Sequence, residues 1–283
     1  MVAAHAVTLR HRPWEEAADF HIGLRTIPLV DWLEGGESDP AARKDALLAS
    51  HPAQVWGELP GSGPGQAEAL AMVDVALGGP ATVAAERPAL LAAARRVPDD
   101  LCLMEKRDGG WRLTALSLCA GSFFTADQAL GRDLAVLHGP APGFQDEMLA
   151  RVERMFDALR PELVLERRNW TVSNSAELFA PDPASIRSRI GDIDPAQAGR
   201  ALNLRVERQT LRRLPKTGGV LFTIRIWLAP LESLRADSRA LDGFAEAWRR
   251  APARFRAYKR LDLYDGLVEA FLRQGVKTAT SQD

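Results

Sequence analysis

The chain is poor in cysteine, in net charge and in long apolar runs. Its two cysteines, Cys102 and Cys119, are too few for a disulfide framework and lack Cys-x-x-Cys spacing. A formal net charge of −1 gives no electrostatic basis for binding nucleic acid or an anionic membrane. No segment approaches the ~20 apolar residues that a membrane span needs, and residues 1–9 lack the pattern of a signal peptide. We therefore expect a cytoplasmic protein with reduced thiols and with no nucleic-acid or membrane partner.

Recognisable enzyme motifs are also scarce. The glycine-rich stretch 61–65 resembles a phosphate-binding loop, but it lacks the Lys-Ser/Thr pair of a P-loop and follows no convincing strand. No second His or Cys stands at zinc-ligand spacing from His138. Ser117, Ser122 and Thr125 have no recognisable partner base. Phosphate-loop, zinc and serine chemistry therefore have little support, and no dinucleotide fingerprint, kinase or DNA-binding module is visible.

Hydrophobic periodicity and turn residues favour a single α+β domain over residues 1–283. The composition, 46% hydrophobic and 26% charged, is ordinary for a globular protein. Helical patterns precede and follow a run of hairpin-linked strands, which predicts an antiparallel sheet flanked by an N-terminal helical arm and by closing helices. The expected helices span 39–50, 66–77, 84–96, 143–159, 237–250 and 261–274, and the expected strands span 101–105, 111–119, 163–170, 202–214 and 220–228. Residues 180–200 read as irregular.

Charged residues alternate along the strand expected at 202–214. Arg205, Glu207 and Gln209 share one face, because successive side chains of a strand point to opposite sides. The opposite face carries Leu204, Val206, Arg208 and Thr210. On the next strand Arg225 points away from an apolar face, so one interpretation places it with Arg205, Glu207 and Gln209 around a polar pocket. The alternative is a solvated face with cross-strand ion pairs, each of which contributes only a few tenths of a kcal/mol.

His138 is the only histidine after residue 51, and Gly-Pro-Ala-Pro follows it. Neutral imidazole is a common ligand of haem iron, which needs one strong protein ligand on its proximal side. The alternative is a hydrogen-bonded structural histidine. Trp170 could likewise have a purely structural role, since an isolated tryptophan usually fills a hydrophobic core.

Several of these segments, in order and spacing, resemble the family of haem-dependent oxidative N-demethylases. The most specific is 204–215, Leu-Arg-Val-Glu-Arg-Gln-Thr-Leu-Arg-Arg-Leu-Pro. The other matching stretches are Gly23–Trp32, Glu105, Leu137–Pro142, Arg168–Trp170, Phe222–Arg225 and Tyr258–Lys259, so the resemblance covers roughly residues 20–275. The chain departs from the family pattern after Cys119, where Ala-Gly-Ser-Phe-Phe stands in place of an expected Pro-Ser and Trp. This change leaves the identity of the substrate open.

The resemblance implies a PAS-like sheet, at about residues 100–230, that holds haem b. It implies oxidation of a small secondary amine such as dimethylamine with O₂. Electrons would come from NADPH through partner subunits that carry FMN and a 2Fe-2S cluster, and a folate-binding partner would take up the released one-carbon unit. His138 matches the family's histidine motif and is the expected iron ligand. Arg208, Gln209 and Trp170 are expected to contact the cofactor.

With haem chemistry in view, the charged strand face suggests catalytic roles for three residues. Glu207 is expected to bind or deprotonate the ammonium group of the substrate, and Arg205 and Arg225 are expected to polarise bound oxygen. Two alternatives remain: a PAS-like haem sensor of gas or redox state without turnover, and a PAS-like protein without haem that binds an apolar ligand or a partner. A charged residue beside the iron favours the enzyme, whereas a wholly apolar distal pocket favours the sensor.

Overall fold

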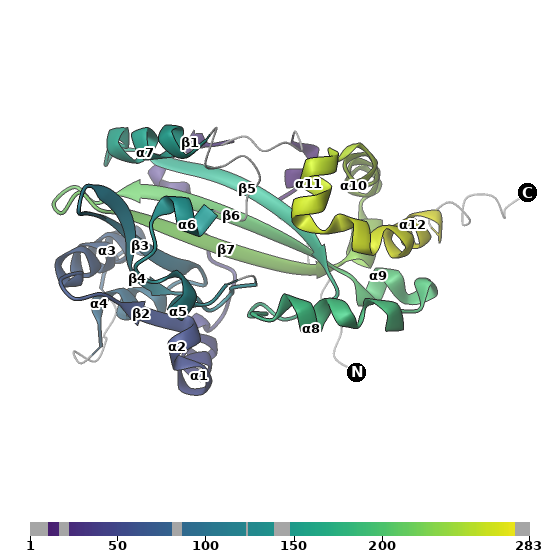
Figure 1. The fold of residues 1–283 in the computed structure, drawn as a ribbon, viewed down its shortest axis with the longest axis horizontal. Coiled ribbons are helices and arrows are strands. Elements are labelled where there is room, and N and C mark those ends of the chain that lie inside the picture. The colour runs from purple at the N-terminus through teal and green to yellow at the C-terminus, as the bar shows by residue number, and fades with distance from the viewer. Residues whose placement is uncertain (1–10, 17–22, 81–86, 123, 139–147, 275–283) are drawn as a thin grey trace, which may run out of the picture. The chain divides into compact units, whose positions relative to one another are not determined.

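The computed structural model describes residues 11–16, 23–80, 87–122, 124–138 and 148–274, and of His138 it describes only the backbone. The parts of the expected elements that fall at 84–86 and 143–147, and the Gly-Pro-Ala-Pro segment at 139–142, lie outside the described residues. Within them, seven strands form one antiparallel sheet in the order β1-β5-β6-β7-β3-β4-β2 (Figure 1). This sheet and its helices confirm the α+β class, while the PAS-like character stays a prediction.

The strands are β1 (Arg25–Ile27), β2 (Trp56–Glu58), β3 (Asp100–Arg107), β4 (Gly110–Ser117), β5 (Val164–Ser173), β6 (Asn203–Arg213) and β7 (Val220–Pro230). The α-helices are α1 (Pro40–Ser50), α2 (Pro52–Val55), α3 (Gly63–Ala76), α4 (Ala89–Ala94), α5 (Ala126–Ala129), α6 (Leu134–His138), α7 (Leu149–Ala158), α8 (Pro183–Ser188), α9 (Ala198–Ala201), α10 (Ser238–Arg250), α11 (Ala253–Lys259) and α12 (Asp265–Gln274). The 3₁₀ helices are η1 (Pro13–Glu15), η2 (Leu29–Asp31), η4 (Ile190–Asp192), η5 (Pro195–Gln197), η6 (Leu231–Ala236) and η7 (Leu261–Tyr264). No described helix has the length and apolar content needed to cross a lipid bilayer.

Local sequence explains where the best-predicted elements begin and turn. The Asp39 carboxylate accepts a hydrogen bond from the Ala42 amide at 2.9 Å, and Pro40 is the first residue of α1. Between β3 and β4, Asp108 and Gly109 both have positive φ angles, 51° and 83°, as a tight hairpin turn requires. The helix and the hairpin therefore lie where capping and turn residues predict them.

The chain divides into two compact units, each of which is described separately. The first comprises Met1–His21, Arg168–Glu207 and Ile226–Asp283, and the second comprises Ile22–Arg167 and Arg208–Arg225. Strands β5, β6 and β7 each contribute residues to both units. The expectation of one domain over the whole chain stays a prediction.

An aromatic core fills the first unit. Trp170 of β5 packs against Phe244 and Trp248 of α10, with ring centroids 5.7 Å and 6.4 Å apart. Leu204 and Val206 of β6 are buried in the same core. Helices α10, α11 and α12 lie together in Figure 1 and supply much of this core. The helices of this unit therefore cover the face of β6 that carries Leu204 and Val206.

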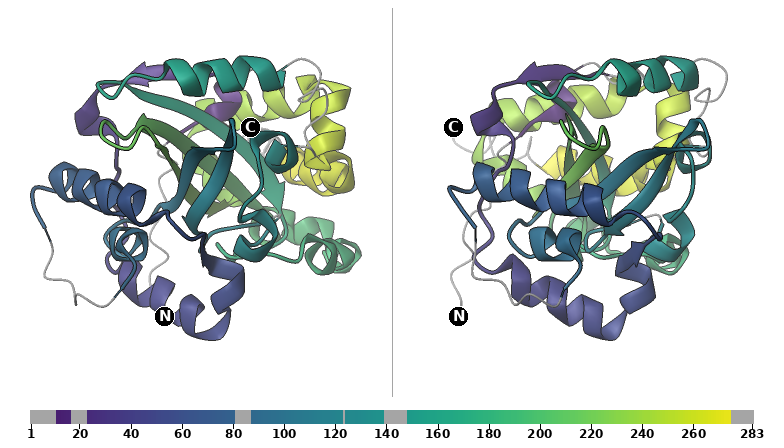
Figure 2. Two further views of the ribbon diagram at one scale, coloured as in Figure 1. Left: turned by 60° about the vertical axis from the view of Figure 1, so that its left-hand side comes forward. Right: turned by 90° about the vertical axis from the view of Figure 1, so that its left-hand side faces the viewer.

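Helices α3 and α4 and the β3–β4 hairpin supply much of the core of the second unit. Helices α3 and α4 pack on each other and on β3 and β4 (Figure 2). Trp32, which follows η2, is completely buried in this core, and its indole Nε1 donates to Thr210 Oγ1 at 3.1 Å. The Thr210 hydroxyl also lies 2.7 Å from the Thr223 hydroxyl of β7. These buried contacts fix which side chains of β6 and β7 point toward the core.

Candidate functional site

Arg205 and Glu207 lie on the face of β6 that points away from the aromatic core of the first unit. Leu204 and Val206 are buried in that core, so alternation turns Arg205 and Glu207 to the other side. The Arg205 Nη1 atom donates to the Leu178 carbonyl oxygen at 3.2 Å, and Arg205 is buried. Glu207 is half-buried. A cation and a carboxylate therefore stand two residues apart on one strand face, as the sequence predicts.

In the second unit, Arg225 lies on a different face from the one that the sequence analysis assigned to it. The hydroxyl contact between Thr210 and Thr223 requires both threonines to point to the same side of the sheet. Alternation then places Arg208 and Arg225 on that side and Gln209 on the opposite one. The expectation that Arg225 shares a face with Gln209 is therefore wrong. Each strand's own alternation is legible in the sequence, but the matching of faces between strands depends on their register.

Arg208 is held entirely by protein acceptors on the buried face. It is 1% exposed, and its guanidinium donates to the Glu166 carboxylate and to the carbonyl oxygens of Trp32, at 2.9 Å, and Asp31. An ion pair of 3.4 Å with Glu34 adds to this set. These contacts tie η2 and β5 to β6, which is the arrangement of a structural arginine. Its expected contact with a cofactor stays a prediction.

Trp170 is 3% exposed and lies within the aromatic core of the first unit. Its neighbours are side chains of β6 and of the closing helices. This placement matches the alternative interpretation, in which the indole fills the core. The expected contact of Trp170 with a cofactor stays a prediction.

His138 is the last residue of α6, and its side chain lies outside the described part of the chain. Helix α6 packs against α7, and the carbonyl oxygen of Phe156 in α7 accepts a hydrogen bond from Arg213 Nη1 at 2.8 Å. Alternation along β6 places Arg213 on the same face as Gln209. Helix α7, with α6 against it, therefore lies at the end of the strand face that carries Gln209.

Apolar side chains of β3 and β7 also lie on that face. Cys102 of β3 stands directly opposite Phe222 of β7, and Met104 stands opposite Val220, so these side chains share one side of the sheet. Phe222 is half-buried, whereas Cys102 and Met104 are buried. Burial raises the pKa of the Cys102 thiol far above its ordinary value, so this side chain stays neutral. The second unit therefore presents an apolar strand face beside a half-buried amide, that of Gln209.

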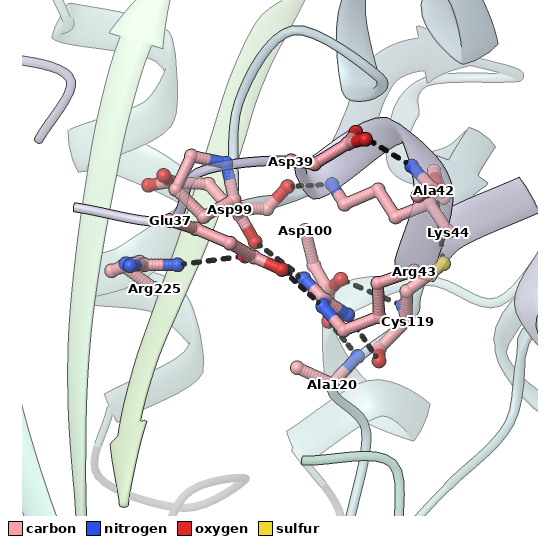
Figure 3. Close-up of polar contacts among 12 residues, drawn as sticks. Glu37, Asp39, Ala42, Arg43, Lys44, Asp99, Asp100, Cys119, Ala120 and Arg225 are labelled. Atoms are coloured by element: carbon pink, nitrogen blue, oxygen red, sulfur yellow. Dashed lines mark hydrogen bonds and ion pairs between the residues drawn. The ribbon is translucent and has the colours of Figure 1, made fainter. Parts of the chain in front are cut away.

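Sequence reasoning missed a group of six charged side chains, which we call the charge cluster: Glu37, Arg43, Lys44, Asp99, Asp100 and Arg225. Figure 3 shows them converging from the segment before α1, from α1 itself, from the start of β3 and from β7. Lys44 occupies the same helix face as Leu47 and Leu48, a position that is usually apolar. A lysine at apolar spacing, together with an Asp-Asp pair before an apolar strand, is the signal that could have revealed the cluster.

Ion pairs and backbone contacts hold most of the charge cluster in place. The Glu37 carboxylate accepts from Arg43 at 2.7 Å and 3.2 Å, and it lies 3.5 Å from Arg225 Nη1. Arg43 also donates to the carbonyl oxygen of Cys119 at 3.0 Å. The Asp100 carboxylate accepts from the Cys119 and Ala120 amides at 2.7 Å and 2.9 Å. Arg43 and Asp100 therefore bind the loop after β4 from two sides.

A family model described as "Haem-dependent oxidative N-demethylase, alpha subunit-like" matches residues 71–268. The match spans well over half of the chain, and it includes α6 with His138, all of β6, and β7.

The donor chemistry of the chain fits the group that this family name implies. Haem brings four nitrogen ligands of its own, so one imidazole and an apolar wall can hold it. The chain offers His138 at the end of α6 and the apolar strand face of Cys102, Met104 and Phe222. Among the described residues, no group of three or more His, Cys, Asp or Glu side chains could hold a metal ion. The extent of the family match shows that this chain belongs to the haem-dependent oxidative N-demethylase alpha-subunit-like family.

Proposed function

We propose that the chain binds haem b in the cytoplasm and catalyses the oxidative N-demethylation of a small secondary amine, such as dimethylamine, with O₂. The observation that carries this proposal is the family match over 71–268, which includes both His138 and the polar face of β6. Bound haem supplies the redox chemistry for reducing O₂ and oxidising the amine. The chain's own residues must hold the iron, bind the amine and manage its proton.

His138 would bind the iron through one ring nitrogen, and Gln209 would contact the cofactor from β6. The apolar face of Cys102, Met104 and Phe222 would exclude water from the macrocycle. We assign the substrate end to Arg205 and Glu207. A small secondary amine is an ammonium at neutral pH, so a carboxylate beside it can both bind the cation and accept its proton.

Arg205 is suited to a fixed electrostatic role. Its guanidinium is buried and anchored to the Leu178 carbonyl oxygen, so its charge is oriented before any substrate arrives. A preorganised cation stabilises negative charge that develops on oxygen. Arg225 lies on the face of Arg208, and we therefore assign it to the charge cluster instead of the substrate site.

In the proposed reaction, other subunits supply the electrons. The family name describes an alpha subunit, which supports partners that complete the reaction. We propose a reductase that transfers electrons from NADPH through FMN and a 2Fe-2S cluster. A folate-binding subunit would take up the one-carbon unit released from the amine.

Two substitutions test the proposal. His138→Ala should abolish the Soret band of the purified protein, because the iron loses its imidazole ligand and haem is no longer retained. His51→Ala, at an exposed histidine after α1, should leave the band unchanged. Glu207→Gln should keep the haem content but lower amine-dependent O₂ consumption about 10²–10⁴-fold, the usual contribution of a positioned base. Glu232→Gln, on the surface of the same unit, serves as its control.

The outcomes separate the competing functions. Wild-type turnover in Glu207→Gln removes Glu207 from the mechanism. Haem binding without any amine-dependent O₂ consumption would point to a sensor, and a haem-free chain would contradict the proposal entirely. The haem-loaded protein is titrated with mono-, di- and trimethylamine while its absorption spectrum is recorded. The amine that changes the spectrum at the lowest concentration is the preferred one.

A further inference from the structure

Asp99 stands apart from the other members of the charge cluster. Its side chain is completely buried, and neither carboxylate oxygen has a hydrogen-bond partner among the described residues. A buried carboxylate without donors is costly when ionised, and it is far less costly when protonated. Ionisation of Asp99 would therefore make the buried arrangement of the charge cluster less stable.

Charged groups from several elements act electrostatically on Asp99. Arg225 comes from β7, Lys44 from α1 and Arg208 from β6, and Asp100 is its neighbour in the chain. Lys44 is 2% exposed, and its Nζ atom donates to the Asp99 backbone carbonyl oxygen, not to the carboxylate. The nearest cations are thus engaged elsewhere, since Arg225 also pairs with Glu37 at 3.5 Å.

We propose that Asp99 makes the charge cluster a pH-sensitive clamp on α1 and on the loop at Cys119 and Ala120. The clamp is closed while the Asp99 carboxyl group is neutral, and it loosens when that group ionises. An ionised Asp99 competes for Arg225 and Lys44 with Glu37 and with its own backbone carbonyl, or it draws water into the cluster. Either change weakens the contacts that hold α1 against β3 and β7.

The direction of the effect follows from linkage. Burial raises the pKa of Asp99 to about 6 from 3.8, although Arg225, Lys44 and Arg208 partly oppose the rise. Because the pKa is higher in the closed state, the neutral acid stabilises that state at low pH. This stabilisation is lost as the pH rises through about 6, so local opening increases with pH. Between pH 5.0 and 7.5 the equilibrium constant for local opening should increase about tenfold for a group with these two pKa values.

Neighbouring acids in the cluster behave differently. Burial alone would raise the pKa of Glu37, but its ion pair with Arg43 holds that pKa below the usual range, so Glu37 stays ionised at both pH values. Burial also raises the pKa of Asp100, whose carboxylate nevertheless accepts two backbone N–H groups. A substitution at Asp99 alone therefore separates its titration from that of Asp100.

Hydrogen–deuterium exchange of the full chain at pH 5.0 and 7.5, corrected for the intrinsic exchange rate, tests the clamp. In the wild type, peptides from α1 and from residues 118–122 should lose protection about tenfold at the higher pH. Asp99→Asn, which keeps the shape but cannot ionise, should show the same protection at both. The matched control is Asp45→Asn on α1: ion pairs with Arg95 and Arg87 hold the pKa of Asp45 low despite partial burial, so this variant should keep the wild-type pH dependence.

Two results would overturn the clamp. One is wild-type protection of α1 that does not change with pH, a measurement that needs no variant and so stands even if Asp99→Asn does not fold. The other is an Asp99→Asn variant that retains the wild-type pH dependence, because another group would then be titrating.

Discussion

At the scale of single residues, the buried ion pair between Glu166 and Arg208 allows the cost of a substitution in free energy of unfolding to be predicted. Glu166 accepts from Arg208 and, at 2.7 Å, from Arg25, whose side chain is 51% exposed. Arg208→Met removes the buried cationic partner of the Glu166 carboxylate, and it should lower the free energy of unfolding by about 3–5 kcal/mol. Arg25→Met should lower it by no more than about 1 kcal/mol. Urea unfolding of the two variants measures both values.

The same pair of variants tests the cofactor contact that the sequence suggested for Arg208. A variant with unchanged unfolding free energy but reduced haem content would contradict the structural role and favour that contact. Loss of stability in the apo protein supports the structural role, because no cofactor is present to be lost.

Residue faces show what sequence alone can establish about the site. Alternation along one strand correctly places Arg205 and Glu207 together, because that relation depends only on the two-residue period. It misplaces Arg225, because the face shared by two strands depends on a register that the Thr210–Thr223 contact fixes. The charge cluster is harder to predict from the sequence, since its six members come from three stretches that are distant in the chain: 37–44, 99–100 and residue 225.

At the scale of one element, two glycines of α3 provide a matched comparison. A Cβ atom on Gly65 would lie 2.7 Å from Glu105 Oε1 and 3.0 Å from a methyl group of Leu103, whereas one on Gly63 would meet nothing within 4 Å. The Glu105 carboxylate cannot move away without losing the hydrogen bond that it accepts from Thr114 Oγ1 at 2.7 Å. Gly65→Ala should therefore destabilise the protein by about 1–3 kcal/mol despite the better helix propensity of alanine.

Gly63→Ala is the control for this comparison. With open space around its Cβ, it should be neutral or should stabilise by up to about 1 kcal/mol. Thermal unfolding of both variants gives the difference. Equal effects at the two positions would show that close packing of α3 on β3 does not determine the cost.

The elements that sequence patterns predicted are the long ones with clear caps or turns. Strands β1 and β2 have three residues each, too few for a two-residue period to be recognised. Residues 180–200 read as irregular because they are polar and contain three prolines, yet they include α8 and the start of α9. In the structure Pro183 lies in the first turn of α8, after Asp182, whose carboxylate accepts from Ser185 N at 3.0 Å. A proline in the first turn is compatible with a helix, so the presence of Pro183 does not exclude α8.

At the scale of the whole molecule, the proposed function makes the chain dependent on an external electron source. NADPH gives up two electrons as a hydride, whereas haem iron accepts electrons singly, so a flavin is needed between them. The isolated, haem-loaded and flavin-free chain should oxidise NADPH no faster than buffer, with or without dimethylamine. Adding a flavin and iron–sulfur reductase should produce NADPH oxidation that depends on the amine, and Glu207→Gln should lose this dependence. Rapid NADPH oxidation by the chain alone would show that it accepts hydride directly and would remove the need for a reductase partner.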